Sequence, residues 1–175
     1  PTRRSSDLPH LIDEKNAKLL TSHHIFTDAE LHSRYEIKLD NYVKTLHIEA
    51  GTLAEIIQKD LLPSITTYME KIAQTAALKK SVVPDISVSA EASLLTQLTE
   101  LSETMTKDLE TLKKDTAMAE YETGKDLLKS AKLYQSVVLS DMEKVRASAD
   151  AAEVLIPDSI LPYPTYGKLL FSISD

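Results

Sequence analysis

Two histidines and two glutamates lie close together in the stretch HSRYEIKLDNYVKTLHIEA, which covers residues 32–50. Imidazole nitrogens and carboxylate oxygens bind divalent metals, and both groups can transfer protons in catalysis. The four residues are His32, Glu36, His47 and Glu49. Their spacing on a helix decides whether they can act together or only flank a buried face.

His32 and Glu36 are four residues apart, so they share a helical face and could hold one metal together. Two ligands do not complete a site, and a di-metal helical bundle needs Glu-x-x-His motifs on paired helices. None of the five histidines follows a glutamate at that spacing, and no HExxH motif is present. We interpret the pair as polar cover at the edge of an apolar stripe. A di-metal helical oxidase remains the alternative, and it predicts tight metal binding.

The other histidines also favour structural roles. His47 and Glu49 are two residues apart and therefore point to different faces. His23 and His24 fall at the end of the first expected helix, where a cation suits the helix dipole. A Gly-x-Ser-x-Gly elbow, a phosphate-binding loop and a dinucleotide fingerprint are all missing from the sequence. We predict that this sequence holds no catalytic, no cofactor-binding and no metal-ligating residue.

Composition predicts helices. The 175 residues include three glycines, seven prolines and 5% aromatics, which is too few turn and aromatic residues for a sheet protein of this size. The formal net charge is −7 and no basic patch alternates with aromatics, which argues against nucleic-acid binding. No apolar run reaches the length of a membrane span, and cysteine is absent. These features fit a cytoplasmic protein without a membrane or nucleic-acid partner.

Start signals mark the first two expected helices. The first covers about residues 11–24, with Asp13 as its N-cap. The second begins at Asp28, because Thr27 and Glu30 have capping-box spacing and the flanking apolar pair has hydrophobic-staple spacing. That pair is Phe26 and Leu31.

An apolar stripe with steps of three and four predicts the buried face of the second helix. Pro63 lies within the continuing pattern, so we expect a kink or break near Leu62, with helix persisting to about Lys80. The stripe consists of Leu31, Tyr35, Leu39, Tyr42 or Val43, Leu46, Ala50, Leu53 and Ile57. Tyr68 and Tyr134 lie on or beside other stripes, so they too are expected to pack in the core.

Connectors divide the remainder of the chain. Residues 81–90 contain Pro84, and residues 120–126 contain Gly124 and lose the stripe, so both are expected to be turns. Between and after them, apolar periodicity predicts helices over residues 94–112 and 127–152. Three prolines make the tail irregular until about Tyr166. The expected fold class is all-α: an antiparallel bundle of about four to five helices with a proline-rich, irregular C-terminal tail.

The first eight residues, PTRRSSDL, are polar and non-periodic. They can be read back as the in-frame translation of a common sequencing adapter, and a disordered tail is the alternative. We therefore expect residues 1–8 to be non-native or disordered, and residues 9–175 to be one helical domain. The chain is then expected to be the end of a larger protein.

Two segments of the sequence resemble type III glutamine synthetases. The likeness covers about residues 9–175, and it departs from the family at Leu161, where a tryptophan is usual, and at His24, where a glycine is frequent. The first segment, IFTDAELHSRYEIKLDNYVKTLHIEAGTLAEIIQKDLLPSITTY, resembles the region that follows the catalytic domain. Its matching residues are Phe26, Glu30, Leu31, Arg34, Tyr35, Glu36, Tyr42, Lys44, Ile48, Glu49, Ala50, Leu62 and Pro63, and those of the C-terminal signature are Pro162, Pro164, Thr165, Tyr166, Gly167, Leu169, Leu170 and Phe171.

The resemblance implies a parent enzyme that joins glutamate and ammonia through a γ-glutamyl phosphate, using ATP and Mg²⁺ or Mn²⁺. The family's ligands lie on upstream domains, so no catalytic residue carries over and this piece is expected to be inactive and to bind no cofactor. Family members form two stacked hexameric rings. The resemblance therefore implies a C-terminal accessory domain whose partners are its own catalytic domain and neighbouring subunits.

Two questions stay open from the sequence. A free-standing helical adaptor that binds partner helices is the alternative to the accessory domain. The tail residues Tyr163, Tyr166 and Phe171 could dock as aromatic anchors on the assembly or fold back onto their own bundle.

Overall fold

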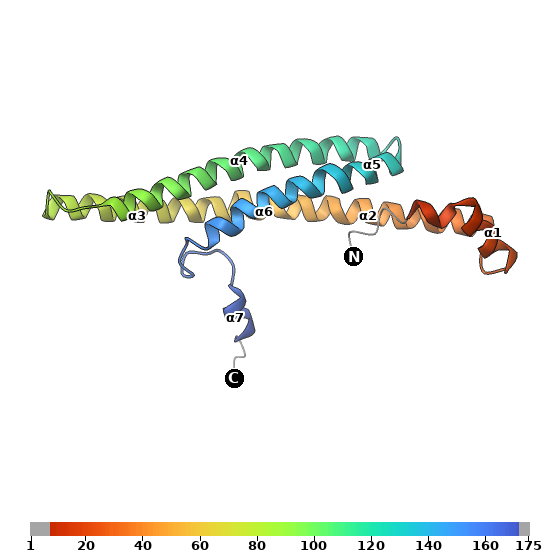
Figure 1. Cartoon of the computed structure of the whole chain (residues 1–175), viewed down its shortest axis with the longest axis horizontal. Helices are drawn as coiled ribbons and strands as arrows, with labels where there is room; N and C mark the ends of the chain where they lie inside the picture. The colour runs from red at the N-terminus through yellow and green to blue at the C-terminus, as the bar shows by residue number, and fades with distance from the viewer. Residues whose placement is uncertain (1–7, 172–175) are drawn as a thin grey trace. The chain divides into compact units, whose positions relative to one another are not determined.

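The computed structural model describes residues 8–171, apart from the side chain of Tyr166. The prediction for residues 1–8 therefore falls, except for Leu8, outside the described residues. Residues 8–171 form helices, with short connections except for the long irregular segment between α6 and α7 (Figure 1), so the all-α class is confirmed. In order, they are η2 (Pro9–Ile12), α1 (Glu14–Ser22), α2 (Asp28–Ile56), η3 (Ile57–Leu61), α3 (Leu62–Val82), α4 (Ser89–Thr123), α5 (Leu127–Leu133), η4 (Tyr134–Val138), α6 (Leu139–Glu153) and α7 (Tyr166–Leu170).

The chain divides into two compact units. The first holds the described residues up to Thr52 together with Leu112–Met142. The second holds Leu53–Thr111 and the described residues from Glu143 onward. None of the helices within residues 8–171 has the length and apolarity needed to cross a bilayer.

The core of the first unit follows the predicted stripe of α2. Of the two candidates that the pattern left open, Val43 is buried and Tyr42 is half-buried. The buried apolar residues of this unit are Leu31, Tyr35, Leu39, Val43, Leu46 and Ala50 of α2, Leu112 and Ala119 of α4, and Ala131, Tyr134 and Val138 of α5 and η4.

The second unit has its own core. Ala54 takes the buried position that the stripe assigned to Leu53, which is half-buried. Tyr68 is half-buried as well. The buried apolar residues are Ala54, Ile57, Leu61, Ile65, Ile72, Leu98, Met105, Leu109, Val145, Ala149, Ala152 and Ile156.

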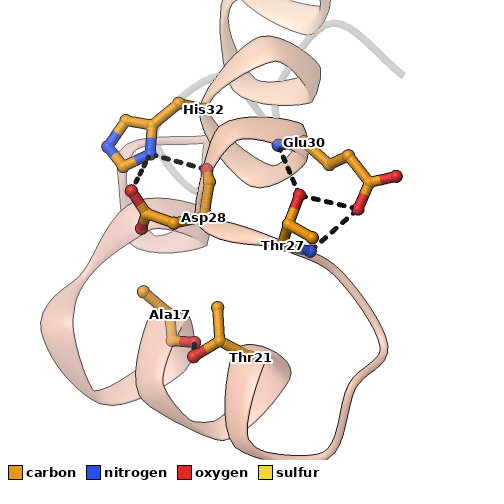
Figure 2. Close-up of polar contacts among 6 residues, drawn as sticks. All are labelled: Ala17, Thr21, Thr27, Asp28, Glu30 and His32. Carbon is orange, nitrogen blue, oxygen red and sulfur yellow. Dashed lines mark hydrogen bonds and ion pairs between the residues drawn. The ribbon is translucent and has the colours of Figure 1, made fainter.

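The start of α2 is the predicted capping box (Figure 2). The Glu30 amide donates to the Thr27 hydroxyl at 3.2 Å, and the Thr27 amide donates to the Glu30 carboxylate at 2.8 Å. These bonds satisfy donors that the first helical turn leaves unpaired. Of the expected staple residues, Leu31 is fully buried, while the half-buried Phe26 ring lies 4.7 Å from the Arg34 guanidinium.

The end of α1 is a Schellman motif. His24 has a φ of 53°, and the amides of His24 and Ile25 donate to the carbonyls of Thr21 and Leu20 at 3.1 and 3.0 Å. Glycine is favoured at such a left-handed position, so a glycine in place of His24 would fit the same turn. At the other end of α1, Asp13 occupies the predicted N-cap position but makes no side-chain cap bond, and it accepts from His10 instead.

Pro63 perturbs the helix where the sequence indicated, without ending it. The five residues of η3 form a π-helical turn directly before α3, in which Pro63 is the second residue. The Leu62 amide bonds to the Ile57 carbonyl. Proline lacks an amide hydrogen and crowds the carbonyl four residues earlier, and the wider π-turn relieves this conflict.

A tight turn joins α4 to α5 inside the first unit. α4 runs to Thr123, so residues 120–123 of the predicted turn are helical, and the chain reverses only over Gly124 and Lys125. Asp126 caps α5 by accepting from the Lys129 amide at 2.9 Å. Fully buried Ser130 donates to the Ala119 carbonyl at 2.9 Å and lies 2.7 Å from the Thr123 hydroxyl, which fixes the two helices to each other.

Candidate functional site

His32 is tied to the first turn of its own helix. Figure 2 shows its Nδ1 atom facing Asp28, 3.0 Å from the backbone carbonyl and 3.6 Å from the carboxylate. Asp28 follows the capping residue, so both groups belong to the helix start. Glu36, which shares the helical face of His32, is exposed. The contacts of His32 are therefore those of a helix-end residue.

His47 has partners that sequence spacing could not indicate. Its Nδ1 atom lies 2.9 Å from the hydroxyl of Tyr134, and its Nε2 atom lies 4.0 Å from the Glu120 carboxylate. Three segments of the first unit therefore meet here: α2, η4 and α4. Glu49 is exposed and takes no part. The pairing of His47 with Tyr134 could not be found from the sequence, because the fold is needed to show which buried tyrosine faces the histidine.

The electrostatics of this cluster oppose catalysis by the phenol. Tyr134 is fully buried, and burial, with a smaller contribution from Glu120, raises its pKa to about 12. A nucleophile or base needs a pKa moved toward neutrality. The Tyr134 hydroxyl finds its hydrogen-bond partner in Nδ1 of His47. The cluster satisfies a buried hydroxyl and links three helical segments.

No metal centre is apparent in the described part of the chain. Within residues 8–171, no group of three or more His, Asp or Glu side chains is placed to hold an ion. The histidines at the end of α1 are both exposed, and His23 is the C-cap residue. That the sequence holds no catalytic, cofactor-binding or metal-ligating residue stays a prediction.

The tail of the second unit is the feature that most suggests an interaction. Tyr163 folds back, since its hydroxyl donates to the Glu153 carboxylate of α6. Burial above all, and then the bond to Glu153, raises the pKa of Tyr163. The end of the tail instead faces solvent: Phe171 is 86% exposed and Leu170 is 72% exposed. Folding back is therefore confirmed for Tyr163, docking of Phe171 stays a prediction, and the side chain of Tyr166 lies outside the described residues.

A hollow of about 630 Å³ lies between the end of α6 and this tail. We call it the tail groove, and Val154, Leu161, Tyr163 and Leu169 are its main apolar residues. Three carboxylates and one guanidinium also line it: those of Asp150, Glu153, Asp158 and Arg146. The groove therefore combines apolar and charged side chains, as protein-binding surfaces do.

Comparisons with known proteins agree on one family. Residues 2–80 match the family model described as the glutamine synthetase C-terminal domain. The chain is 42% identical to a glutamine synthetase of Butyrivibrio fibrisolvens over 95% of its own length and 23% of that protein. It is 28% identical to the type-3 glutamine synthetase of Dictyostelium discoideum and 23% identical to a glutamine synthetase of Bacteroides fragilis, each over 94% of this chain. The chain spans about a quarter of the length of these relatives, 23% in each case.

Proposed function

We propose that this chain, which matches the glutamine synthetase C-terminal domain family over residues 2–80 and is 42% identical to a named glutamine synthetase, is the accessory C-terminal part of a longer glutamate–ammonia ligase. The observation that carries the proposal is the alignment over 95% of the chain with only 23% of a named glutamine synthetase. Residues 9–175 are proposed to serve as one helical accessory domain, inactive by itself.

The contacts of the polar residues support a non-catalytic domain. His32 and His47, the two histidines best placed to do chemistry, bond to Asp28 and Tyr134 of the same unit. By family likeness, ATP and Mg²⁺ or Mn²⁺ are proposed to bind the remainder of the enzyme. A cytoplasmic location follows from the same family likeness and is part of the proposal.

The domain's own task is proposed to be structural. Long helices with single buried faces make a stiff scaffold, and the exposed apolar end of the tail is suited to bury against another surface. The proposed partners are the catalytic domain and neighbouring subunits of a homo-oligomer, arranged by family likeness as two stacked hexameric rings. In this role the domain braces the assembly rather than acting on substrate.

Complete sequencing of the gene, followed by assay of its product, tests the proposal. We expect a reading frame that continues upstream, and ATP-dependent glutamine formation by the complete protein with Mg²⁺ or Mn²⁺. The 175-residue chain alone is expected to form none. Deletion of residues 157–175 from the complete protein is expected to weaken the oligomer.

Three results would count against it. A start codon near Leu8 would favour the free-standing adaptor. Glutamine formation by the short chain would contradict the inactive domain. Unchanged assembly after the deletion would contradict a bracing role for the tail.

A further inference from the structure

We infer that the tail groove is a docking surface for a positively charged segment with an apolar side chain, supplied by the part of the longer protein outside this structure. The inference rests on the proposed function, because it takes the chain to be one part of a larger enzyme. It specifies which surface binds the remainder of the enzyme and by what chemistry.

The apolar side chains at this surface are largely exposed to solvent. Val154 on the groove wall is 84% exposed, and Leu169, Leu170 and Phe171 beyond it are 55%, 72% and 86% exposed. Single exposed apolar residues are ordinary, but here Val154 and Leu169 line one groove and two more exposed apolar residues, Leu170 and Phe171, directly follow Leu169 in the chain, and grouped exposed apolar residues mark binding surfaces in soluble proteins. The proline-restricted chain before α7 reduces the conformational entropy lost when this patch is covered.

The charged part of the surface is acidic. Around Tyr163 lie the carboxylates of Asp60, Asp150 and Glu153, all of which act on its hydroxyl. Asp158 adds a fourth carboxylate, while Arg146 and Lys168 are the cations paired with Asp150 and Asp158 at 3.6 and 3.5 Å. Four acids against two bases leave a formal net charge of 2 − 4 = −2. Exposed pairs of this kind are weak, so an incoming arginine or lysine can compete for the carboxylates.

The negative charge of the tail groove also indicates which of two partners binds there, a second copy of this chain or the remainder of the longer protein. A second copy of this chain would bring a formal net charge of −7 toward an acidic groove, and like charges across an interface are unfavourable. The relatives devote 23% of their length to the shared stretch, so most of such a protein is available to supply a basic segment. The remainder of the protein is therefore the occupant to which we commit.

Photo-crosslinking in the complete protein tests the inference. A benzoyl-phenylalanine placed at Leu170, which is 72% exposed, reports what lies against the groove. We expect mass spectrometry to find crosslinks to a segment outside these 175 residues that contains arginine or lysine beside an apolar residue. Crosslinks only within the same chain, or only to the same region of a second copy, would overturn it.

A charge-reversal pair tests the electrostatic part. Asp150→Lys is expected to lower the crosslink yield about tenfold, since it places a cation where a cation should bind. Glu100→Lys makes the same charge change at an exposed position of α4 and should leave the yield unchanged. Equal yields from both variants would overturn the assigned charge, provided that circular dichroism shows both to be folded.

Glutamine formation measured on the same preparations separates the two hypotheses. An active enzyme without the crosslink would overturn the docking surface and leave the proposed function intact. An inactive complete protein with the crosslink would overturn the proposed ligase activity and support the docking surface. The readouts are independent because none of the altered residues is proposed to contact substrate.

Discussion

Turns η3 and η4 each place five residues of π-helix between two α-helices, one in each compact unit. In η3, Pro63 follows two residues after the turn, and the cause is local: the ring cannot accept normal α-helical packing before it. In η4 the sequence is YQSVV, which contains neither proline nor glycine. Its first residue is Tyr134, fully buried and bonded to His47.

The difference shows how one backbone distortion can arise from two sources. η3 has a local cause, Pro63, so the π-helical turn should be present only while that residue is present. η4 lacks such a residue, and we infer that it is held by tertiary contacts, because it sets the buried hydroxyl of Tyr134 against a side chain 87 positions away. The predictions below test that contrast.

The largest effect is expected from Tyr134→Ala. Removing a fully buried aromatic ring leaves a cavity and orphans His47, so the free energy of unfolding should fall by about 3–5 kcal/mol. Urea unfolding followed by circular dichroism measures the change. Tyr121→Ala, at a position 65% exposed, is the matched control and should change it by no more than about 0.5 kcal/mol. Similar losses in both variants would contradict a tertiary origin for η4.

The next effect should have the opposite sign. Pro63→Ala restores an amide hydrogen and a strong helix former, so the free energy of unfolding should rise by about 1–3 kcal/mol. Pro157→Ala changes an exposed proline outside a helix and should instead lower it by about 0.4–1 kcal/mol through the unfolded chain. Destabilisation by Pro63→Ala would mean that η3, like η4, is required by the packing around it.

A smaller loss is expected at the capping box. Thr27→Ala removes the hydroxyl that accepts from the Glu30 amide, and such changes lower the free energy of unfolding by about 1 kcal/mol. Thr45→Ala, exposed in the middle of α2, provides a control that should stay within about 0.5 kcal/mol of the parent. If both substitutions behave alike, the cap contributes nothing beyond helix propensity.

The smallest effect is a dependence on pH at the same cap. Hydrogen bonds from the Thr27 amide, and then from its hydroxyl, lower the pKa of Glu30 below 4.5. A carboxyl group with a lowered folded pKa stabilises above its unfolded pKa, and this stabilisation is lost as the pH falls through the folded value. Carboxyl NMR should therefore show Glu30 titrating below 4.5. A midpoint at or above that value would show that the cap bonds are absent in solution.

The structural features that could be predicted from the sequence are those with local causes. The capping box, the turn at Gly124, the perturbation near Pro63 and the irregular tail each depend on residues within one or two helical turns. The stripe could not choose between Tyr42 and Val43, and it assigned Leu53 where Ala54 is buried. Steps of three and four allow either neighbour, and only packing decides.

In the candidate site, too, some features could be predicted from the sequence and others depend on the fold. The spacing of His47 gave reason to doubt a joint site with Glu49, but its bonds to Tyr134 and Glu120 depend on helices brought together by the fold. In the tail, prolines predicted irregular chain. They could not predict that Tyr163 would fold back while Phe171 stays exposed, since that depends on where Glu153 lies.

The Ser130 linkage has a consequence for how the molecule acquires its structure. Its bonds to Thr123 and Ala119 span only seven and eleven positions, so little chain entropy is lost when they form. Short-range contacts of this kind assemble early in folding. We therefore expect the end of α4 and the beginning of α5 to nucleate the first unit, with Ser130→Ala giving a kinetic φ-value of about 1; a value of about 0 would place this hairpin among the last parts to form.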